Sequence, residues 1–149
     1  MTPRLRTLLF SLSLITLVGC EGSGDDPQIT QTLPGEGQWR LVNYWAIWCE
    51  PCREEIPALN LVDQRDHIRV LGFNFDGKTG DELAAQAAEL GITFELLNFD
   101  PGTLLGVPRP QGLPITVVVS PDGAVTKTLL GPQTEESLLA ATAAGVGEG

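Results

Sequence analysis

The feature that most constrains this chain is a pair of cysteines, Cys49 and Cys52, placed where a predicted strand gives way to a predicted helix. The strand is the apolar run 41–45, and Pro51 fits the first turn of a helix, where its missing N–H costs nothing. Two cysteines three residues apart at a helix start can form a disulfide without moving the backbone. Unpaired N–H groups and the helix dipole stabilise a thiolate there, and the thiolate is the form that attacks disulfides. The position therefore predicts a redox-active pair in which Cys49 is the reactive thiol.

A structural disulfide and half of a zinc site are the alternative interpretations of this pair. Zinc needs two further ligands, but the sequence has no second cysteine pair, and its single histidine, His67, lies far along the predicted helix. A structural bridge closing so small a loop adds little stability, because the entropy removed from the unfolded chain grows with loop length. Redox function is therefore favoured, and no metal site is expected.

Residues 1–19 have the pattern of a secretory signal peptide, with two early arginines followed by an apolar run that is too short to span a bilayer comfortably. The run ends at Leu17-Val18-Gly19-Cys20, which resembles the bacterial lipobox. We therefore expect cleavage before Cys20 and a lipid on that residue, which also accounts for the odd third cysteine of an exported protein. An ordinary signal peptide with a chance cysteine is the alternative.

The charge of the mature chain excludes two classes of partner. Removing Arg4 and Arg6 with the signal leaves seven basic residues against nineteen acidic ones, a formal net charge of −12. Such a domain has no electrostatic attraction for nucleic acid and is repelled by anionic lipid headgroups, so lipid on Cys20 is the expected membrane contact. Residues 20–37 consist mainly of Gly, Asp, Pro, Gln and Thr, with little to bury, and predict a flexible tether.

Residues 38–149 alternate strand and helix signals and suffice for one compact domain. The expected elements are strands at 41–45, 70–75, 94–99, 115–119 and 125–130, and helices at 50–67, 81–90 and from the N-cap Thr134 through Ala144. Pro121-Asp122-Gly123 predicts a hairpin turn between the last two strands. This order predicts an α/β domain with a central mixed sheet, helices on both faces, and a C-terminal antiparallel hairpin plus helix.

Two segments resemble a known family. The segment 42–57, VNYWAIWCEPCREEIP, resembles the active-site segment of the TlpA-like thioredoxins, which are exported, membrane-tethered thiol-disulfide proteins that include the cytochrome c maturation reductants. Residues 112–116, GLPIT, followed by SPDG at 120–123, resemble the second signature of that family. The resemblance implies a thioredoxin fold and an oxidoreductase that reduces disulfides of exported proteins on the periplasmic face of a bacterial membrane. It implies no cofactor beyond the Cys49–Cys52 disulfide, and a membrane electron donor is expected to keep the pair reduced.

Carried over residue by residue, the resemblance makes Cys49 the attacking thiol and Cys52 the resolving thiol. Pro114 becomes a cis-proline facing the disulfide. The backbone of Leu113 is then expected to pair with an extended client segment, a strand-addition mode of recognition. Trp48, which precedes Cys49, is expected to contact the client as well.

The resemblance also makes Glu55 the acidic residue behind the disulfide. Thioredoxin has a buried Asp where this chain has Asn43, which cannot take a proton. Cys52 and Glu55 are three residues apart on one helix and therefore neighbours, so we expect Glu55 to accept the proton that Cys52 must lose. The alternative is that Glu54 and Glu55 are simply acids favoured in a first helical turn. We favour the functional role for Glu55 and the simpler one for Glu54.

Residues 72–79, GFNFDGKT, match the P-loop pattern letter for letter, between a predicted strand and a predicted helix. Two phenylalanines and Asp76 stand where a phosphate-binding loop needs small residues and free N–H groups, so nucleotide binding is not expected.

A chaperone or assembly factor of the same fold, with an incidental cysteine pair, is the alternative to an oxidoreductase. Only the chaperone would keep its activity without both thiols.

Overall fold

The computed structural model describes residues 31–143. The predicted signal peptide at 1–19, the predicted lipid site Cys20 and the tether up to residue 30 lie outside the described residues. Within the predicted tether, Leu33 is buried against one face of the sheet, among side chains of its central strands. The last part of that segment therefore packs on the domain.

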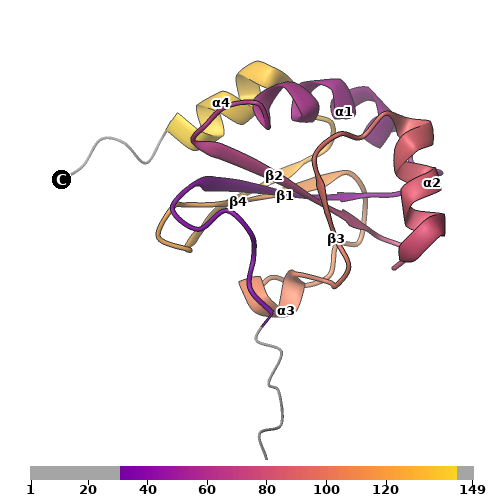
Figure 1. The fold of residues 1–149 in the computed structure, drawn as a ribbon. Helices are drawn as coiled ribbons and strands as arrows, with labels where there is room; N and C mark the ends of the chain where they lie inside the picture. Colours follow the sequence, from indigo (N-terminus) through magenta and orange to yellow (C-terminus); the bar gives the residue numbers. More distant parts are fainter. Residues whose placement is uncertain (1–30, 144–149) are drawn as a thin grey trace, which may run out of the picture. The chain divides into compact units, whose positions relative to one another are not determined.

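Five strands form a mixed sheet in the order β3-β2-β1-β4-β5 (Figure 1). Their bounds are β1 Trp39–Trp45, β2 Ile68–Asn74, β3 Glu95–Leu97, β4 Ile115–Val119 and β5 Val125–Leu130. The first three strands run parallel to one another, whereas β4 is antiparallel to both of its neighbours, β1 and β5. The expected mixed sheet with an antiparallel C-terminal hairpin is confirmed.

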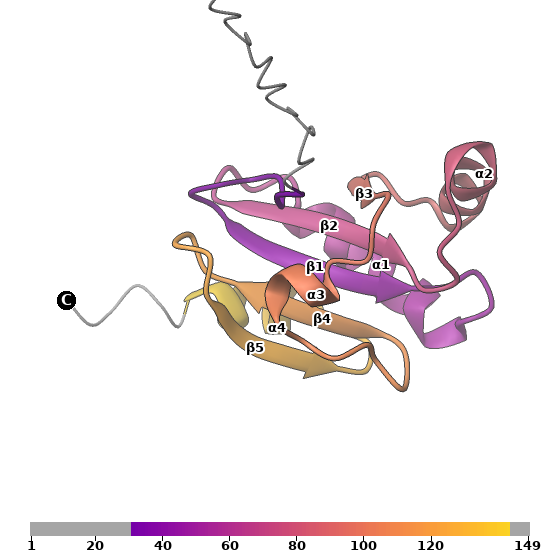
Figure 2. The ribbon, with the colours of Figure 1, turned by 90° about the horizontal axis from the view of Figure 1, so that it is seen from below.

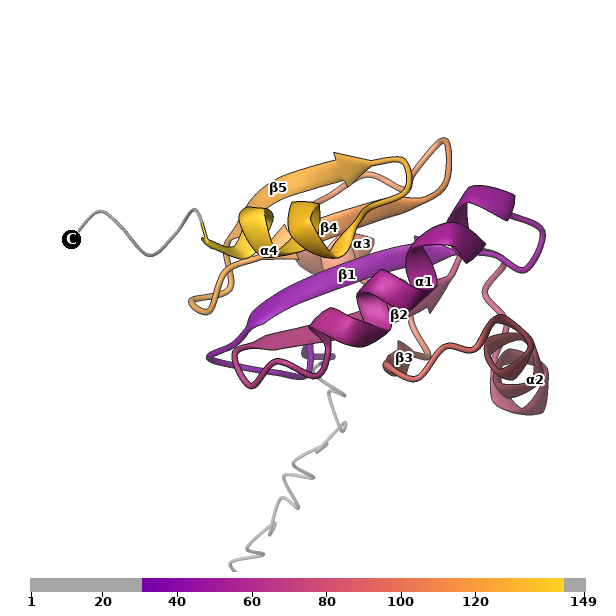
Figure 3. The same cartoon turned by 90° about the horizontal axis from the view of Figure 1, so that it is seen from above.

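Four helices accompany the sheet: α1 Glu50–Val62, α2 Gly80–Leu90, α3 Gly102–Leu105 and α4 Glu135–Ala143. Helices α1 and α4 lie together over one face (Figure 3), and the short α3 lies over the opposite face (Figure 2). Helices on both faces are therefore confirmed, although α3 was not predicted because its four residues are too few for a helical pattern. Thr134 caps α4 as predicted, since its Oγ1 accepts a hydrogen bond from Ser137 N (3.2 Å).

The central strand β1 divides the hydrophobic core because its side chains alternate between the two faces. Leu41 packs with Leu59 of α1 in a first cluster. Val42 and Tyr44 join Val117 of β4 in a second cluster on the other face. All seven residues of β1 are buried, so the strand is fixed on both faces and delivers the following loop to a defined place.

Helix α1 ends at Val62, five residues before the predicted end. Asp63 explains the difference, because its Oδ1 accepts a hydrogen bond from the backbone N–H of Val70 (2.7 Å). The next residues form a tight turn in which Arg65 N donates to the Val62 carbonyl (3.1 Å). The chain therefore reverses early, and β2 begins at Ile68.

The P-loop-like segment 72–79 begins inside β2. A Cβ at Gly72 would lie 2.7 Å from the Phe94 ring and 3.1 Å from Trp45 Nε1, so side-chain packing requires this glycine. In the turn that follows, the side-chain oxygen of Asn74 accepts hydrogen bonds from the backbone N–H groups of Asp76 (3.1 Å) and Lys78 (3.2 Å). The N–H groups of Asp76 and Lys78 are therefore used in hydrogen bonds within the turn and are not free to bind a phosphate.

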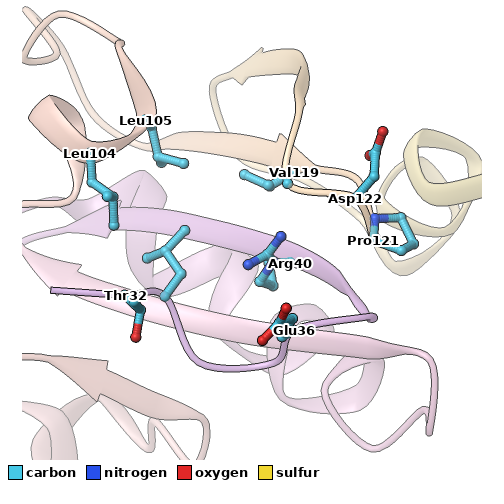
Figure 4. Close-up of a pocket in the computed structure, with 10 residues that line it drawn as sticks. Thr32, Glu36, Arg40, Leu104, Leu105, Val119, Pro121 and Asp122 are labelled. Carbon is cyan, nitrogen blue, oxygen red and sulfur yellow. The ribbon is translucent and has the colours of Figure 1, made fainter. Parts of the chain in front are cut away.

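A cavity of about 400 Å³ lies at the start of β1 (Figure 4). The cysteine pair, by contrast, follows the end of that strand. Arg40 lies in it between Glu36 and Asp122, and the buried guanidinium donates a hydrogen bond to the Ser120 carbonyl (3.1 Å). A hydrogen bond from the Ser120 hydroxyl lowers the pKa of Asp122, and the nearby Arg40 adds to this effect. We assign Arg40 a structural role, because it fixes the turn between β4 and β5.

Candidate active site

Cys49 and Cys52 form a disulfide at the N-terminus of α1, with their Cα atoms 5.3 Å apart. Cys49 is the N-cap residue in an extended conformation, and its Sγ accepts a hydrogen bond from the backbone N–H of Cys52 (3.2 Å). Cys49 retains 4% exposure and Cys52 none. Cys49 is therefore the more accessible sulfur, although it is far less exposed than a residue at the end of a loop is expected to be.

The two cysteines belong to a small hydrophobic cluster with Trp45 and Ala46 of the preceding segment. Leu83 and Ala87 of α2 close this cluster. Phe75 and Leu113, both half-buried, pack against it from two further segments. The disulfide therefore lies in an apolar setting assembled from the end of β1, the start of α1 and one side of α2.

Glu55 lies on the buried side of α1, one turn after Cys52, and is 1% exposed. Its Oε1 accepts a hydrogen bond from Asn43 Nδ2 (2.6 Å), and its Oε2 accepts one from the backbone N–H of Gln133 (3.0 Å). Asn43 Nδ2 also donates to Thr116 Oγ1 (3.0 Å), which ties β1 to β4. The carboxyl group of Glu55 therefore joins α1, the central strands and the segment before α4.

Burial raises the pKa of Glu55 from 4.5 to about 7, although the hydrogen bonds from Asn43 and Gln133 act in the opposite direction. A carboxyl group with such a pKa exchanges its proton near neutral pH, as a general base or acid must. Glu54, the neighbouring acid, is exposed. The two neighbouring glutamates therefore differ in burial, and Glu55 is the one with a raised pKa.

The peptide bond between Leu113 and Pro114 is cis. The two residues line an open cavity of about 450 Å³ together with Leu130 and Gly131 at the end of β5. Leu130 is 72% exposed, so the cavity has an apolar rim that faces solvent. Neither the N–H nor the carbonyl of Leu113 makes a backbone hydrogen bond within residues 31–143, and both stay available to a partner strand.

Trp48 is 61% exposed beside Cys49. Its Nε1 donates a hydrogen bond to Asp76 Oδ2 (2.9 Å), and its ring lies edge-on to Phe75, with the ring centroids 6.4 Å apart. Sequence reasoning missed both partners, because it predicted a strand up to Phe75 and excluded nucleotide binding by the segment 72–79, but gave no contact between this segment and Trp48. The structure shows that this segment forms one side of the cysteine site.

Acidic groups outnumber basic ones around the disulfide. The side chain of Glu50, between the cysteines, is 83% exposed, and Arg53 lies 4.0 Å from it. Arg53 also pairs with Glu89 of α2 (3.3 Å) and donates a hydrogen bond to the Ile47 carbonyl (2.9 Å), which orders the loop before Cys49. The charge of Arg53 is therefore shared among several acceptors.

Within residues 31–143, no group of three or more His, Cys, Asp or Glu side chains is arranged to hold a metal ion. Over the same residues, no helix is long and apolar enough to cross a membrane.

Comparisons with known proteins agree with the site geometry. A family model described as the AhpC/TSA family matches residues 21–128. The chain is 36% identical over 120 residues to the thiol:disulfide interchange protein HelX of Rhodobacter capsulatus, covering 80% of this chain and 67% of that protein. It is 33% identical over 97 residues to the thiol:disulfide interchange protein DsbE of Allochromatium vinosum, covering 64% of this chain and 53% of that protein. The chain thus spans between about half and two thirds of the length of these curated relatives.

A solved structure supports the fold. The thiol:disulfide interchange protein of the thioredoxin family from Chlorobium tepidum TLS matches with a TM-score of 0.62 at 21% identity, over 75% of this chain and 82% of that one. At this identity the likeness concerns the fold alone. Together with the strand order, it shows that the described domain has the thioredoxin fold.

The raised pKa of Glu55 predicts how stability depends on pH. The folded protein keeps a proton on Glu55 at pH values where the unfolded chain, with a pKa of 4.5, has lost it. This contribution is fully present below pH 4.5 and is lost as the pH rises through 7. The free energy of unfolding should therefore fall by about 2 to 3 kcal/mol between pH 5 and pH 8 because of this group.

Urea unfolding of Glu55→Gln at pH 5 and pH 8 measures this contribution. The variant should lose that part of the pH dependence, whereas the exposed-site control Glu54→Gln should keep it. Equal pH dependence in Glu55→Gln and the wild type would show that Glu55 ionises as it does in water.

Proposed function

Since this chain belongs to the AhpC/TSA family, in its TlpA-like group of thioredoxins, we propose that it is a thiol-disulfide oxidoreductase that reduces disulfides of exported proteins. The observation that carries the proposal is the Cys49–Cys52 disulfide at the start of α1, with the buried carboxyl group of Glu55 one turn further on. The electrons are held by the cysteine pair itself, so the reaction needs no bound cofactor.

Reduction of a client begins with the dithiol form. The Cys49 thiolate attacks one sulfur of the client disulfide, which forms a mixed disulfide and releases the other client sulfur as a thiolate. Cys52 then loses its proton and attacks Cys49 Sγ, which forms the Cys49–Cys52 disulfide and releases the second client thiolate. Two electrons have passed to the client, and a dithiol on a membrane partner must return two electrons to the pair.

Glu55 is the base that we assign to the second step. Cys52 is fully buried, so its proton cannot pass directly to bulk water. Glu55 follows on the same buried side of α1 and has a pKa of about 7, so it can accept a proton and later release it near neutral pH. Asn43, held by hydrogen bonds to Glu55 and Thr116, orients the carboxyl group.

Client binding uses the cavity lined by Leu113, a residue that also packs on the cysteine cluster. An extended client segment can pair with the free N–H and carbonyl of Leu113, as in strand addition. Exposed Trp48 beside Cys49 and exposed Leu130 at the rim of the cavity supply apolar contact. The resemblance to cytochrome c maturation reductants makes proteins of that process the client class that we propose, with the chain held on the periplasmic face of a membrane by lipid on Cys20.

A trapping experiment tests the function. In a Cys52→Ala variant the second step cannot occur, so client proteins should remain disulfide-bonded to Cys49 and be released by dithiothreitol. Diagonal gel electrophoresis of periplasmic extracts measures this. If a variant with both Cys49 and Cys52 changed to Ser keeps the biological activity, the chain is a chaperone or assembly factor with an incidental cysteine pair.

The role of Glu55 predicts a kinetic effect on the second step alone. Glu55→Gln should slow release of the mixed disulfide by about a hundredfold, because general acid–base catalysis typically contributes a factor of about 10² to 10⁴. The wild-type rate should rise as the pH passes 7, and the variant should lack that inflection. Stopped-flow kinetics with a peptide disulfide measures both steps. An unchanged second step in Glu55→Gln, matching the Glu54→Gln control, would remove Glu55 from the mechanism.

The charges around the disulfide predict a reducing potential. Glu50 and Glu54, together with Glu55 when it is ionised, disfavour the Cys49 thiolate, and Arg53 opposes them. A less stable reduced form makes a better electron donor, so the potential should lie nearer to thioredoxin, at about −270 mV, than to the strongest oxidants of the fold, at about −120 mV. Equilibration with glutathione buffers measures it. A value close to that of the oxidants would reverse the proposed direction of electron flow.

A further inference from the structure

The loop between α3 and β4 is held to the rest of the domain by very few polar contacts. Residues 108–113 make no backbone–backbone hydrogen bond within residues 31–143. Pro108 and Pro110 have no N–H to donate. The loop nevertheless leads directly to Leu113, which packs on the cysteine cluster, and to Pro114. Apart from this apolar packing of Leu113, a side-chain polar contact must therefore set the position of the loop.

Arg109 supplies that contact. Its Nη2 donates a hydrogen bond to the Phe75 carbonyl (2.5 Å), and its guanidinium lies 4.5 Å above the centre of the Phe75 ring. Its Nη1 lies 3.6 Å from Asp100 Oδ2. The hydrogen bond to Phe75 is the only one that side chains of residues 108–113 form within the described part of the chain.

The partners of Arg109 are themselves fixed. Asp100 Oδ1 accepts hydrogen bonds from the buried Tyr44 hydroxyl (3.1 Å) and from the backbone N–H of Gly102 (2.9 Å). The backbone N–H of Phe75 donates to the carbonyl of Trp45 (2.8 Å), so Phe75 stays registered with the end of β1. Arg109 therefore joins an otherwise weakly held loop to rigid parts of the sheet.

Phe75 extends this connection to the cysteine site. One side of its ring meets Arg109, and the Trp48 ring lies edge-on to it. Trp48 is fixed in turn by its hydrogen bond to Asp76. Arg109, Phe75 and Trp48 thus form one continuous contact from the loop before Pro114 to the residue before Cys49. The P-loop-like segment 72–79 supplies the middle of this contact.

We propose that Arg109 is a positioning residue that sets the distance between Trp48 and the Leu113–Pro114 segment, and thereby selects extended polypeptide disulfides over small ones. The inference rests on the proposed function. A surface ion pair such as Arg109–Asp100 contributes little alone, so the hydrogen bond and the stacking on Phe75 carry most of the effect. A polypeptide needs Trp48 and the Leu113–Pro114 segment in register, whereas a small disulfide needs only Cys49.

Single-turnover kinetics of the reduced full-length protein tests this. In Arg109→Ala, the rate constant for reducing a flexible synthetic peptide with one intramolecular disulfide should fall about tenfold, a loss of about 1.4 kcal/mol of binding in the transition state. The rate constant with hydroxyethyl disulfide should change less than twofold, and the reduction potential should not change. Arg65→Ala is the matched control, because Arg65 forms a surface ion pair with Glu135 (2.8 Å) and is half exposed. Equal losses with both probes, or no loss with the peptide, would overturn the proposal.

NMR relaxation separates this inference from the function on which it rests. Backbone order parameters of residues 111–113 should fall in Arg109→Ala while those of α1 do not change, whatever the activity of the protein. Unchanged order parameters in the loop would overturn the positioning role. If the wild-type dithiol reduces neither probe, the proposed function itself fails, and the relaxation experiment still decides whether Arg109 holds the loop.

Discussion

The buried hydrogen bond between Asn43 and Glu55 is the interaction on which the site depends. A carboxyl group that is 1% exposed would be costly without partners, and Asn43 and the Gln133 backbone satisfy its two oxygens. These contacts fix α1 against β1, and so fix where the cysteine pair lies at the start of that helix. The same burial that makes Glu55 a structural link gives it a pKa near 7, so one group supports the fold and can exchange a proton.

The domain separates its anchoring contacts from its client-facing contacts. The sheet, α1 and α4 form a core in which β1 is buried on both faces. Trp48 beside Cys49 and Leu130 at the rim of the Pro114 cavity stay exposed, and Leu113 keeps its backbone groups free. Within residues 31–143, the side chain of Arg109 makes the one side-chain hydrogen bond of residues 108–113, together with an ion pair and a ring contact. An exchange protein must bind unfolded segments and release them, which favours a weakly held rim on a firmly held core.

Several features of the fold and site were predictable because they are local. Cys49 and Cys52 are three apart, and their place at a helix start follows from the strand, the proline and the helical pattern beside them. The hairpin at 121–123 and the Thr134 cap are likewise short-range signals, and the structure confirms both. The end of α1 was predicted five residues late because Asp63 stops the helix through a hydrogen bond to Val70, which belongs to the next strand.

The sequence by itself determined the cysteine chemistry, the α/β order and the acidic surroundings, since each depends on neighbours along the chain. Only the tertiary structure decided the partners of Glu55 and Trp48. Gln133 lies 78 residues from Glu55, and Asp76 lies 28 residues from Trp48. It also decided that the segment 72–79, with the letters of a phosphate loop, is one side of the cysteine site. The physical reason is that burial and hydrogen bonding act between groups that are close in space. These residues are distant along the chain and become neighbours only when the sheet, helices and loops pack together.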